Sequence, residues 1–342
     1  MSFDYLLKLA NHCAGIKHYR LEDEINNFIL NNIRIAEDMV DNVKSDDDIK
    51  AEFKKLQKAI DTDVRKADIR LLSVNADPKT FKSFKSGKGY LTGILYLAPY
   101  TLSGKNVCPC ASKDCIEACL HTAGNPAFMK SKEKSRISKT QWFFGLPGVK
   151  TFNKKDVPNR NGFLDRLKRE IVALHNIALK YDLKVALRLN GTSDIGWHGI
   201  LREFIKSNPH IKFYDYTKVY SRAKDFAEKE DFPIHQTFSR SEENHDQAMD
   251  ILEKGGNVAV VFDKVPHTYH GYHVIVGDED DLRFLDDEKK PKDKDGKPLG
   301  LVIGLKAKGG AIRQYKKDKA DGYGPEQKFV VRALDMEGFP YL

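Results

Sequence analysis

Between residues 163 and 263, two kinds of apolar segment alternate along the chain. Stretches with apolar residues at helical spacing separate short runs rich in β-branched and aromatic residues. The predicted helices are residues 163–181, 196–207, 221–230 and 244–255, and the predicted strands are residues 184–190, 211–218, 233–240 and 257–263. Because each helix returns the chain to the same edge, this alternation predicts βαβ units and a parallel sheet.

Further strands are predicted on both sides of this region. The apolar run GYLTGILYLAPY precedes it, and residues 272–278 and 299–307 follow it. The insert at residues 286–298 is charged and rich in turn formers, which predicts a solvated loop or hairpin. At least six parallel strands favour a parallel β/α barrel, complete or partial, and an open doubly wound sheet is the alternative.

Residues 1–75 differ from the rest of the chain. Apolar residues at Phe28, Ile29, Ile33 and Ile35, and then at Phe53, Leu56 and Ile60, are interleaved with charged residues at helical spacing. We therefore expect a helical extension over residues 1–75, serving packing or oligomerisation, and an α/β barrel-like domain over residues 76–342.

Four of the five cysteines fall within CPCASKDCIEAC, directly after the first predicted strand. Thiolates bind soft or borderline metal ions, and four within twelve residues are typical of an iron–sulfur cluster, here [4Fe–4S]. Structural zinc, which usually takes cysteine pairs from separate knuckles, is one alternative, and unliganded thiols are another. The candidate ligands are Cys108, Cys110, Cys115 and Cys119, with His121 as a further nitrogen ligand.

Polar residues stand where the predicted strands end. In parallel α/β folds the loops at the carboxyl ends of the strands carry the functional residues. Alternation along residues 184–190 predicts that Arg188 and Asn190 face the same side, where a buried cation and amide need partners. Together with Asp194 and Lys218, they are the candidate catalytic residues, and they suit an anionic or nucleotide-like substrate.

Two other clusters carry polar chemistry. His267, His270 and His273 could hold a metal ion or phosphate, but without an acidic partner a polar loop is favoured. A basic stretch followed by aromatic residues could engage phosphates and bases, or form a solvated helix with a buried aromatic end. Its members are Lys130, Lys132, Lys134, Arg136, Lys139, Gln141, Trp142, Phe143 and Phe144.

The charge balance allows a polyanionic partner without requiring one. The net charge is +8, but 57 basic residues are interspersed with 49 acidic ones. No run of apolar residues is long enough to predict a membrane span, and the N-terminus lacks the layout of a signal peptide. We therefore expect a protein of the reducing cytoplasm, without membrane association and without a disulfide framework.

One resemblance rests on YLTGILYLAPYTLSGKNVCPCASKDCIEACLHTAGN, on SRISKTQWFF and on ALRLNGTSDIGW. Over about residues 90 to 265, the chain resembles the gene product eighty-eight family of tailed-phage proteins. This implies a virus-encoded protein that acts in bacterial cytoplasm, and it implies no particular activity.

A cysteine loop after the first strand of a parallel barrel is also similar to the radical S-adenosylmethionine enzymes, in which three cysteines of that loop bind a [4Fe–4S] cluster. Their C-x3-C-x2-C spacing is absent, and NGTSD stands where a Gly-Gly-Glu would follow the second strand. The resemblance therefore extends to a cluster but puts S-adenosylmethionine binding in doubt.

Two functions remain at this point. The first is a redox or radical enzyme with an iron–sulfur cluster, acting on an anionic, nucleotide-like or nucleic-acid substrate. The second is a zinc-stabilised protein without catalysis that binds nucleic acid or a host protein.

Overall fold

The computed structural model describes residues 46–75, 80, 87–119, 126–229 and 231–335. The chain divides into two compact units, residues 1–63 and residues 64–342. Helix α3 (Asp46–Lys66) contains Phe53, Leu56 and Ile60, whose spacing predicts a helix. The helices expected before residue 46 lie outside the described residues, and the domain boundary after residue 75 stays a prediction.

The second unit contains a ten-stranded sheet in the order β1-β2-β3-β4-β5-β6-β9-β8-β7, with β10 beside β6. The strands are β1 (Leu72–Val74), β2 (Tyr90–Leu95), β3 (Lys184–Arg188), β4 (Ile211–Thr217), β5 (His235–Ser239), β6 (Asn257–Phe262), β7 (Thr268–Tyr269), β8 (Tyr272–Val276), β9 (Leu301–Lys306) and β10 (Val330–Val331). Neighbouring strands are parallel except for β1 on β2 and β7 on β8. The predicted α/β class is confirmed. Among the described strands, β1 and β7 do not pair with each other, so the sheet is open.

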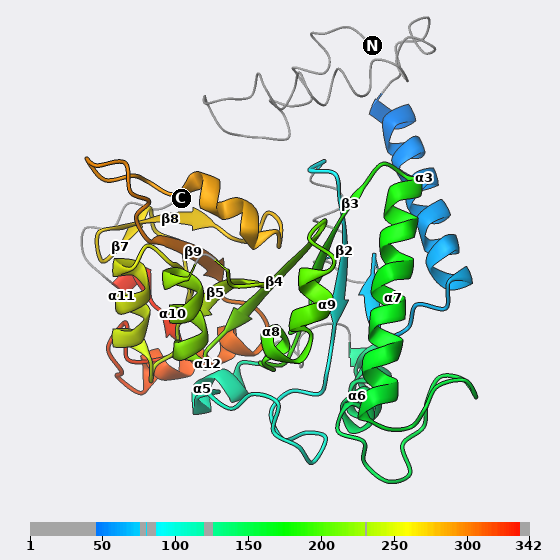
Figure 1. The fold of residues 1–342 in the computed structure, drawn as a ribbon. Coiled ribbons are helices and arrows are strands. Elements are labelled where there is room, and N and C mark those ends of the chain that lie inside the picture. The colour runs from blue at the N-terminus through cyan, green and yellow to red at the C-terminus, as the bar shows by residue number, and fades with distance from the viewer. Residues whose placement is uncertain (1–45, 76–79, 81–86, 120–125, 230, 336–342) are drawn as a thin grey trace, which may run out of the picture. The chain divides into compact units, whose positions relative to one another are not determined.

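The helices of this unit are α5 (Lys113–Glu117), α6 (Pro126–Phe143), α7 (Arg160–Lys180), α8 (Trp197–Ile200), α9 (Arg202–Lys206), α10 (Tyr220–Glu228), α11 (His245–Glu253) and α12 (Gly310–Ala320), with short 3-10 helices η3 (Arg283–Lys289) and η4 (Ala333–Asp335). From β2 to β6 the strand order follows the chain, so right-handed crossovers place the connecting helices on one face. Helix α7 packs on β2 and β3, α10 on β4 and β5, and α11 on β5 and β6 (Figure 1). None of the described helices combines the length and the apolar character needed to cross a membrane.

Burial on the helix-covered face follows the alternation of each strand. Phe238 of β5 and Val258 and Val260 of β6 are fully buried and pack with Ala223 of α10 and Ile251 of α11. Removal of this apolar surface from water, at about 25 cal/mol per Å², is the main force that holds the helices on the sheet.

The opposite face of the sheet is covered because the order in which strands are added to the sheet reverses after β8. Strand β9 lies between β6 and β8, so a right-handed crossover from β8 back to β9 carries residues 277–300 over that face. Leu282, at the start of η3, packs there against Ala186 of β3 and Tyr214 of β4. Residues 277–300 therefore form a second layer, on the face of the sheet opposite the one that α7, α10 and α11 cover.

The structure corrects the prediction for the beginning of the insert at residues 286–298. Residues 283–289 form η3, in which Arg283 and Asp286 are buried and lie 3.2 Å apart as an ion pair. Charged composition indicated a solvated loop, but paired charges of opposite sign can be buried together, since each partly offsets the desolvation of the other.

Candidate functional site

The cysteine loop (residues 96–119) follows the carboxyl end of β2. No disulfide joins its four cysteines, of which Cys110 is exposed and Cys108, Cys115 and Cys119 are partly buried. The loops after β3, β4 and β5 leave the sheet at the same edge, because these strands run parallel to β2. We call these four loops the rim. His121, the fifth predicted ligand, lies outside the described residues.

Helix α5 fixes the second half of the cysteine loop. The Ser112 hydroxyl caps the helix by accepting a 3.2 Å hydrogen bond from the Cys115 N–H. The same hydroxyl donates to the carboxylate of Glu242, just after β5, at 2.8 Å. The other oxygen of Glu242 accepts the Asp114 N–H at 3.0 Å. The helix that carries Cys115 is thereby tied to the loop after β5.

Cys108 is held by main-chain groups on both sides. Its Sγ accepts the Tyr100 N–H at 3.3 Å and lies 3.8 Å from the carbonyl oxygen of Thr192, in the loop after β3. The preceding carbonyl, that of Val107, accepts a 2.7 Å hydrogen bond from the Asp194 N–H. The cysteine loop and the loop after β3 therefore form one connected surface.

The electrostatics of the thiols show how the cysteines relate to one another. Burial raises the pKa of Cys108 to about 12, and the charges of Asp194, Cys119 and Cys115 add to that rise. Burial likewise raises the pKa of Cys110, with Asp194 contributing and Arg222 opposing. Cys115 and Cys119 thus each lie within electrostatic reach of Cys108, and Cys108 is a neutral thiol near pH 7.

Asp194 joins the loops after β3 and β4. Its carboxylate accepts the Thr217 hydroxyl at 2.9 Å and the Lys218 N–H at 2.8 Å, and it forms a buried ion pair with Arg222 of α10. The Lys218 ammonium donates to the Ser239 hydroxyl at 2.6 Å and lies 5.3 Å from the centre of the Phe329 ring. Among the described residues, no carboxylate lies within ion-pair distance of the Lys218 ammonium, which is therefore a cation available at the rim.

Asn190 organises the loop after β3 and has no spare polar atom. Its side-chain oxygen accepts from Ser193, Ile195 and Trp197, and its amide group donates to Ile195 and Asp215. Asp215 also accepts the Asn190 N–H at 2.8 Å, and burial raises the pKa of Asp215 to about 7. The pair sits within the fold beneath the rim.

Alternation predicts that the side chains of Arg188 and Asn190 face the same side of the sheet. In the structure they contact different partners on opposite faces. Arg188 donates to both carboxylate oxygens of Asp281, at 2.9 and 3.3 Å, and lies 4.4 Å from the centre of the Tyr216 ring. Asn190 bonds to Asp215, which precedes Tyr216 along β4 and so points to the opposite face. Because β3 ends at Arg188, the strand alternation does not extend to Asn190.

The basic and aromatic stretch is divided between surface and core. Lys130, Lys132 and Lys134 on α6 are exposed, whereas Trp142 and Phe143 are buried, the Trp142 indole donating to the carbonyl of Val157 at 2.8 Å. The two aromatic residues therefore pack the core and are not available to stack on bases.

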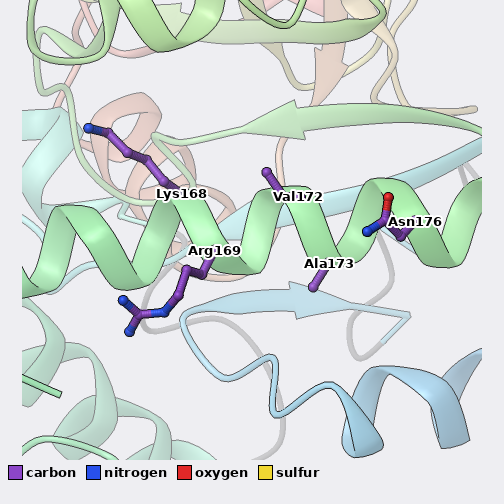
Figure 2. A pocket seen from close by; sticks show the side chains of 5 residues that line it. All are labelled: Lys168, Arg169, Val172, Ala173 and Asn176. Carbon is purple, nitrogen blue, oxygen red and sulfur yellow. The ribbon is translucent and has the colours of Figure 1, made fainter. Parts of the chain in front are cut away.

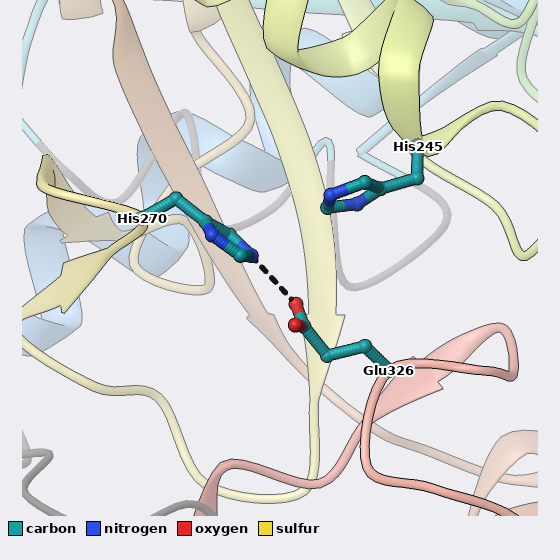
Figure 3. A group of neighbouring side chains, drawn as sticks. All are labelled: His245, His270 and Glu326. Atoms are coloured by element: carbon teal, nitrogen blue, oxygen red, sulfur yellow. Dashed lines mark hydrogen bonds and ion pairs between the residues drawn. The ribbon is translucent and has the colours of Figure 1, made fainter.

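One group of side chains was not recognised as a group in the sequence. His245, His270 and Glu326 place their ligand atoms within 4.8 Å of one another, and they alone do so among the described His, Cys, Asp and Glu residues. They come from three segments (Figure 3), and 56 positions separate His270 from Glu326, so no local spacing in the sequence indicates the group.

A shallow surface depression along α7, lined by Lys168, Arg169, Val172, Ala173 and Asn176, contains none of the predicted site residues (Figure 2).

The fold and the site together define an α/β protein with a cysteine-bearing loop at the carboxyl edge of a mostly parallel sheet. The chain belongs to the Gene product 88 family, whose model matches residues 70–321. The match runs from just before β1 to the end of α12 and extends beyond the resemblance expected over residues 90 to 265. Searches of curated proteins and of solved structures found no significant match.

Proposed function

We propose that Cys108, Cys110, Cys115 and Cys119 bind an iron–sulfur cluster and that the protein is a redox or radical enzyme of a phage. The position of four cysteines, none of them in a disulfide, on one loop at the rim carries the proposal. In parallel α/β proteins this edge is where loops converge on a ligand. When bound, the cluster supplies electron transfer or the generation of a radical.

The arrangement of the cysteines along the chain favours a cluster over a single zinc ion. Four cysteines on one loop are typical of iron–sulfur clusters, whereas structural zinc usually takes cysteine pairs from separate knuckles. The donor set also fits, since it consists of cysteine sulfur atoms alone. Among the described residues, no three of the cysteines have sulfur atoms within 4.8 Å of one another, so a single ion would require the loop to close around it.

A cation at the rim supports an anionic, nucleotide-like substrate. Lys218 has a hydroxyl and an aromatic ring as partners, so its charge is available to a phosphate or carboxylate. Asp194 and Arg222 neutralise each other beside it and position the Lys218 main chain. Arg188 and Asn190 act as positioning residues below the rim. S-adenosylmethionine is not part of this proposal, and nucleic acid enters it only as a larger substrate with the same phosphate groups.

The winding of the sheet supports a partial β/α barrel as the scaffold. Strands β2 to β6 follow one another in chain order, with helices on one face, as in a barrel. This barrel-like winding ends where β9 enters the sheet between β6 and β8. An intact cluster with an exposed Cys110 ligand requires a reducing compartment, so we place the protein in the cytoplasm of the bacterial host.

Anaerobic purification of the full chain, followed by iron, sulfide and zinc analysis, tests the proposal. We expect a brown protein with about four iron and four sulfide atoms per chain. Cys115→Ser and Cys119→Ser should each lower the iron and sulfide content. Cys13→Ser changes the one cysteine outside the loop and should leave the iron and sulfide content unchanged. A colourless protein with about one zinc ion per chain would overturn the cluster and support a structural zinc site instead.

A further inference from the structure

We propose that His245, His270 and Glu326 form a second metal site, which binds a divalent first-row transition ion and fits Zn²⁺ best. Two imidazoles and one carboxylate are a recurring three-ligand set for such ions, and they leave a coordination position for water or a substrate atom. The site shares no residue with the cysteine loop, so it stands independently of the proposed cluster.

Three separate elements bring the ligands together. His245 is the first residue of α11, His270 lies in the turn between β7 and β8, and Glu326 precedes β10. The His245 and His270 ring centroids are 5.1 Å apart, and both rings point toward the Glu326 carboxylate (Figure 3). Nδ1 of His245 is buried and has no hydrogen-bond partner among the described residues. A buried polar atom without a partner is costly.

The distances require little movement for an ion to enter. Bonds of about 2.1 Å at tetrahedral angles put neighbouring ligand atoms about 3.4 Å apart. His270 Nε2 and Glu326 Oε1 are 2.9 Å apart, and all three ligand atoms lie within 4.8 Å of one another. The hydrogen bond between His270 and Glu326 opens by about half an ångström, and the His245 ligand atom approaches the other two by at most about 1.4 Å.

The backbone at His270 is a second observation that points to a site. His270 has a φ of +49° and Gly271 a φ of +81°, the two positive values of a type I′ hairpin turn. Asparagine or glycine is favoured at the first of these positions, and histidine is among the few other residues that adopt a positive φ more often than average. A sparsely populated conformation is retained where a side chain has a role, and here it directs the imidazole at Glu326.

Arg240 determines which ion the site prefers. Its buried guanidinium donates to the main-chain carbonyls of Glu326, Lys328 and Phe329, which fixes the segment that carries Glu326. Its positive charge also opposes a cation nearby. A site whose affinity depends on carboxylate charge, as for Mg²⁺ or Ca²⁺, is therefore disfavoured, whereas imidazole donors retain affinity for Zn²⁺.

A titration of the purified full chain with Co²⁺, followed by its absorption spectrum, tests the site. Wild-type protein should bind one more equivalent of Co²⁺ per chain than the His270→Asn variant. The difference spectrum should contain visible cobalt bands without the near-ultraviolet band of a sulfur ligand, which separates this site from the cysteine loop. Glu326→Gln should weaken binding by about 100-fold, because changes even to groups that only orient a ligand cost 10- to 100-fold.

The variants separate metal loss from misfolding. Asparagine suits the turn better than histidine, so His270→Asn should unfold at a higher urea concentration than wild type in the presence of a chelator. His273→Ala removes an exposed histidine of the adjacent strand and should bind Co²⁺ as wild type does. Equal Co²⁺ uptake by wild type and His270→Asn, or a sulfur band in their difference spectrum, would overturn the proposal.

Discussion

The Asp194 N–H donates a 2.7 Å hydrogen bond to the carbonyl oxygen of Val107, the residue before Cys108. This bond joins the cysteine loop to the loop after β3. Because the Asp194 carboxylate also accepts the Lys218 N–H, three loops of the rim meet at one residue. The position of Cys108 therefore depends on Asp194 and, through it, on the loop after β4.

Replacing Asp194 by alanine should strongly destabilise the protein. The change leaves the Arg222 guanidinium buried without its ion-pair partner, for which a loss of about 3–5 kcal/mol is expected. Urea unfolding followed by circular dichroism measures this. As a control, Asp225→Ala on α10, the helix that carries Arg222, breaks an exposed ion pair with Lys229 and should cost about 0.5 kcal/mol or less. Similar losses in both variants would contradict the role given to Asp194.

The buried carboxyl of Asp215 predicts a pH dependence of stability. Burial raises its pKa from 3.8 to about 7 in the folded protein, so the folded state binds this proton more tightly than the unfolded state. The stability it contributes is complete below about pH 4 and is lost as the pH rises through 7, with a slope of at most about 1.4 kcal/mol per pH unit. Free energies of unfolding measured from pH 5 to 8 should lose this slope in Asp215→Asn, and an unchanged slope would exclude Asp215 as its source.

Arg188 and Asp281 should behave as a buried ion pair of the fold. Arg188→Leu removes the cation that pairs with both carboxylate oxygens of Asp281 and should cost about 3–5 kcal/mol, while Arg188→Leu with Asp281→Leu should cost clearly less than the sum of the two single changes. A double-mutant cycle by urea unfolding gives the coupling energy. Additive losses would show that the two side chains act separately and would return Arg188 to the list of substrate-binding candidates.

Lys218 should contribute to the binding of anions and little to stability. Lys218→Gln is expected to weaken the binding of inorganic pyrophosphate by about tenfold or more, since a hydrogen bond to a charged group is worth about 1.5–3 kcal/mol. Isothermal titration calorimetry at low salt measures this. Lys212→Gln, an exposed lysine near the other end of β4, serves as the control, and equal affinities in both variants would rule out Lys218 as the anion contact.

The α/β class could be predicted because the alternation of helices and strands is encoded locally. Each of β3, β4, β5 and β6 lies within a predicted strand. The position of β9 between β6 and β8 could not be predicted, since strand order depends on pairings between distant residues. The layer containing η3 was missed for the same reason.

The candidate site was predictable only where the residues are close in sequence. The cysteine loop stood out through its spacing, but the separate partners of Arg188 and Asn190 depend on where β3 ends. His270 was noted in the sequence as lacking an acidic partner, and the fold supplies Glu326 from 56 positions away. The partner of a buried polar side chain is set by tertiary structure, which no local pattern contains.

X-ray absorption at the iron and zinc edges of the anaerobically isolated full chain tests the cysteine-bound cluster most directly. We predict an iron signal with a shell of sulfur neighbours and scattering between iron atoms, both reduced in Cys115→Ser and unchanged in Cys13→Ser. A chain without iron, in which zinc alone has a sulfur shell, would contradict the iron–sulfur cluster.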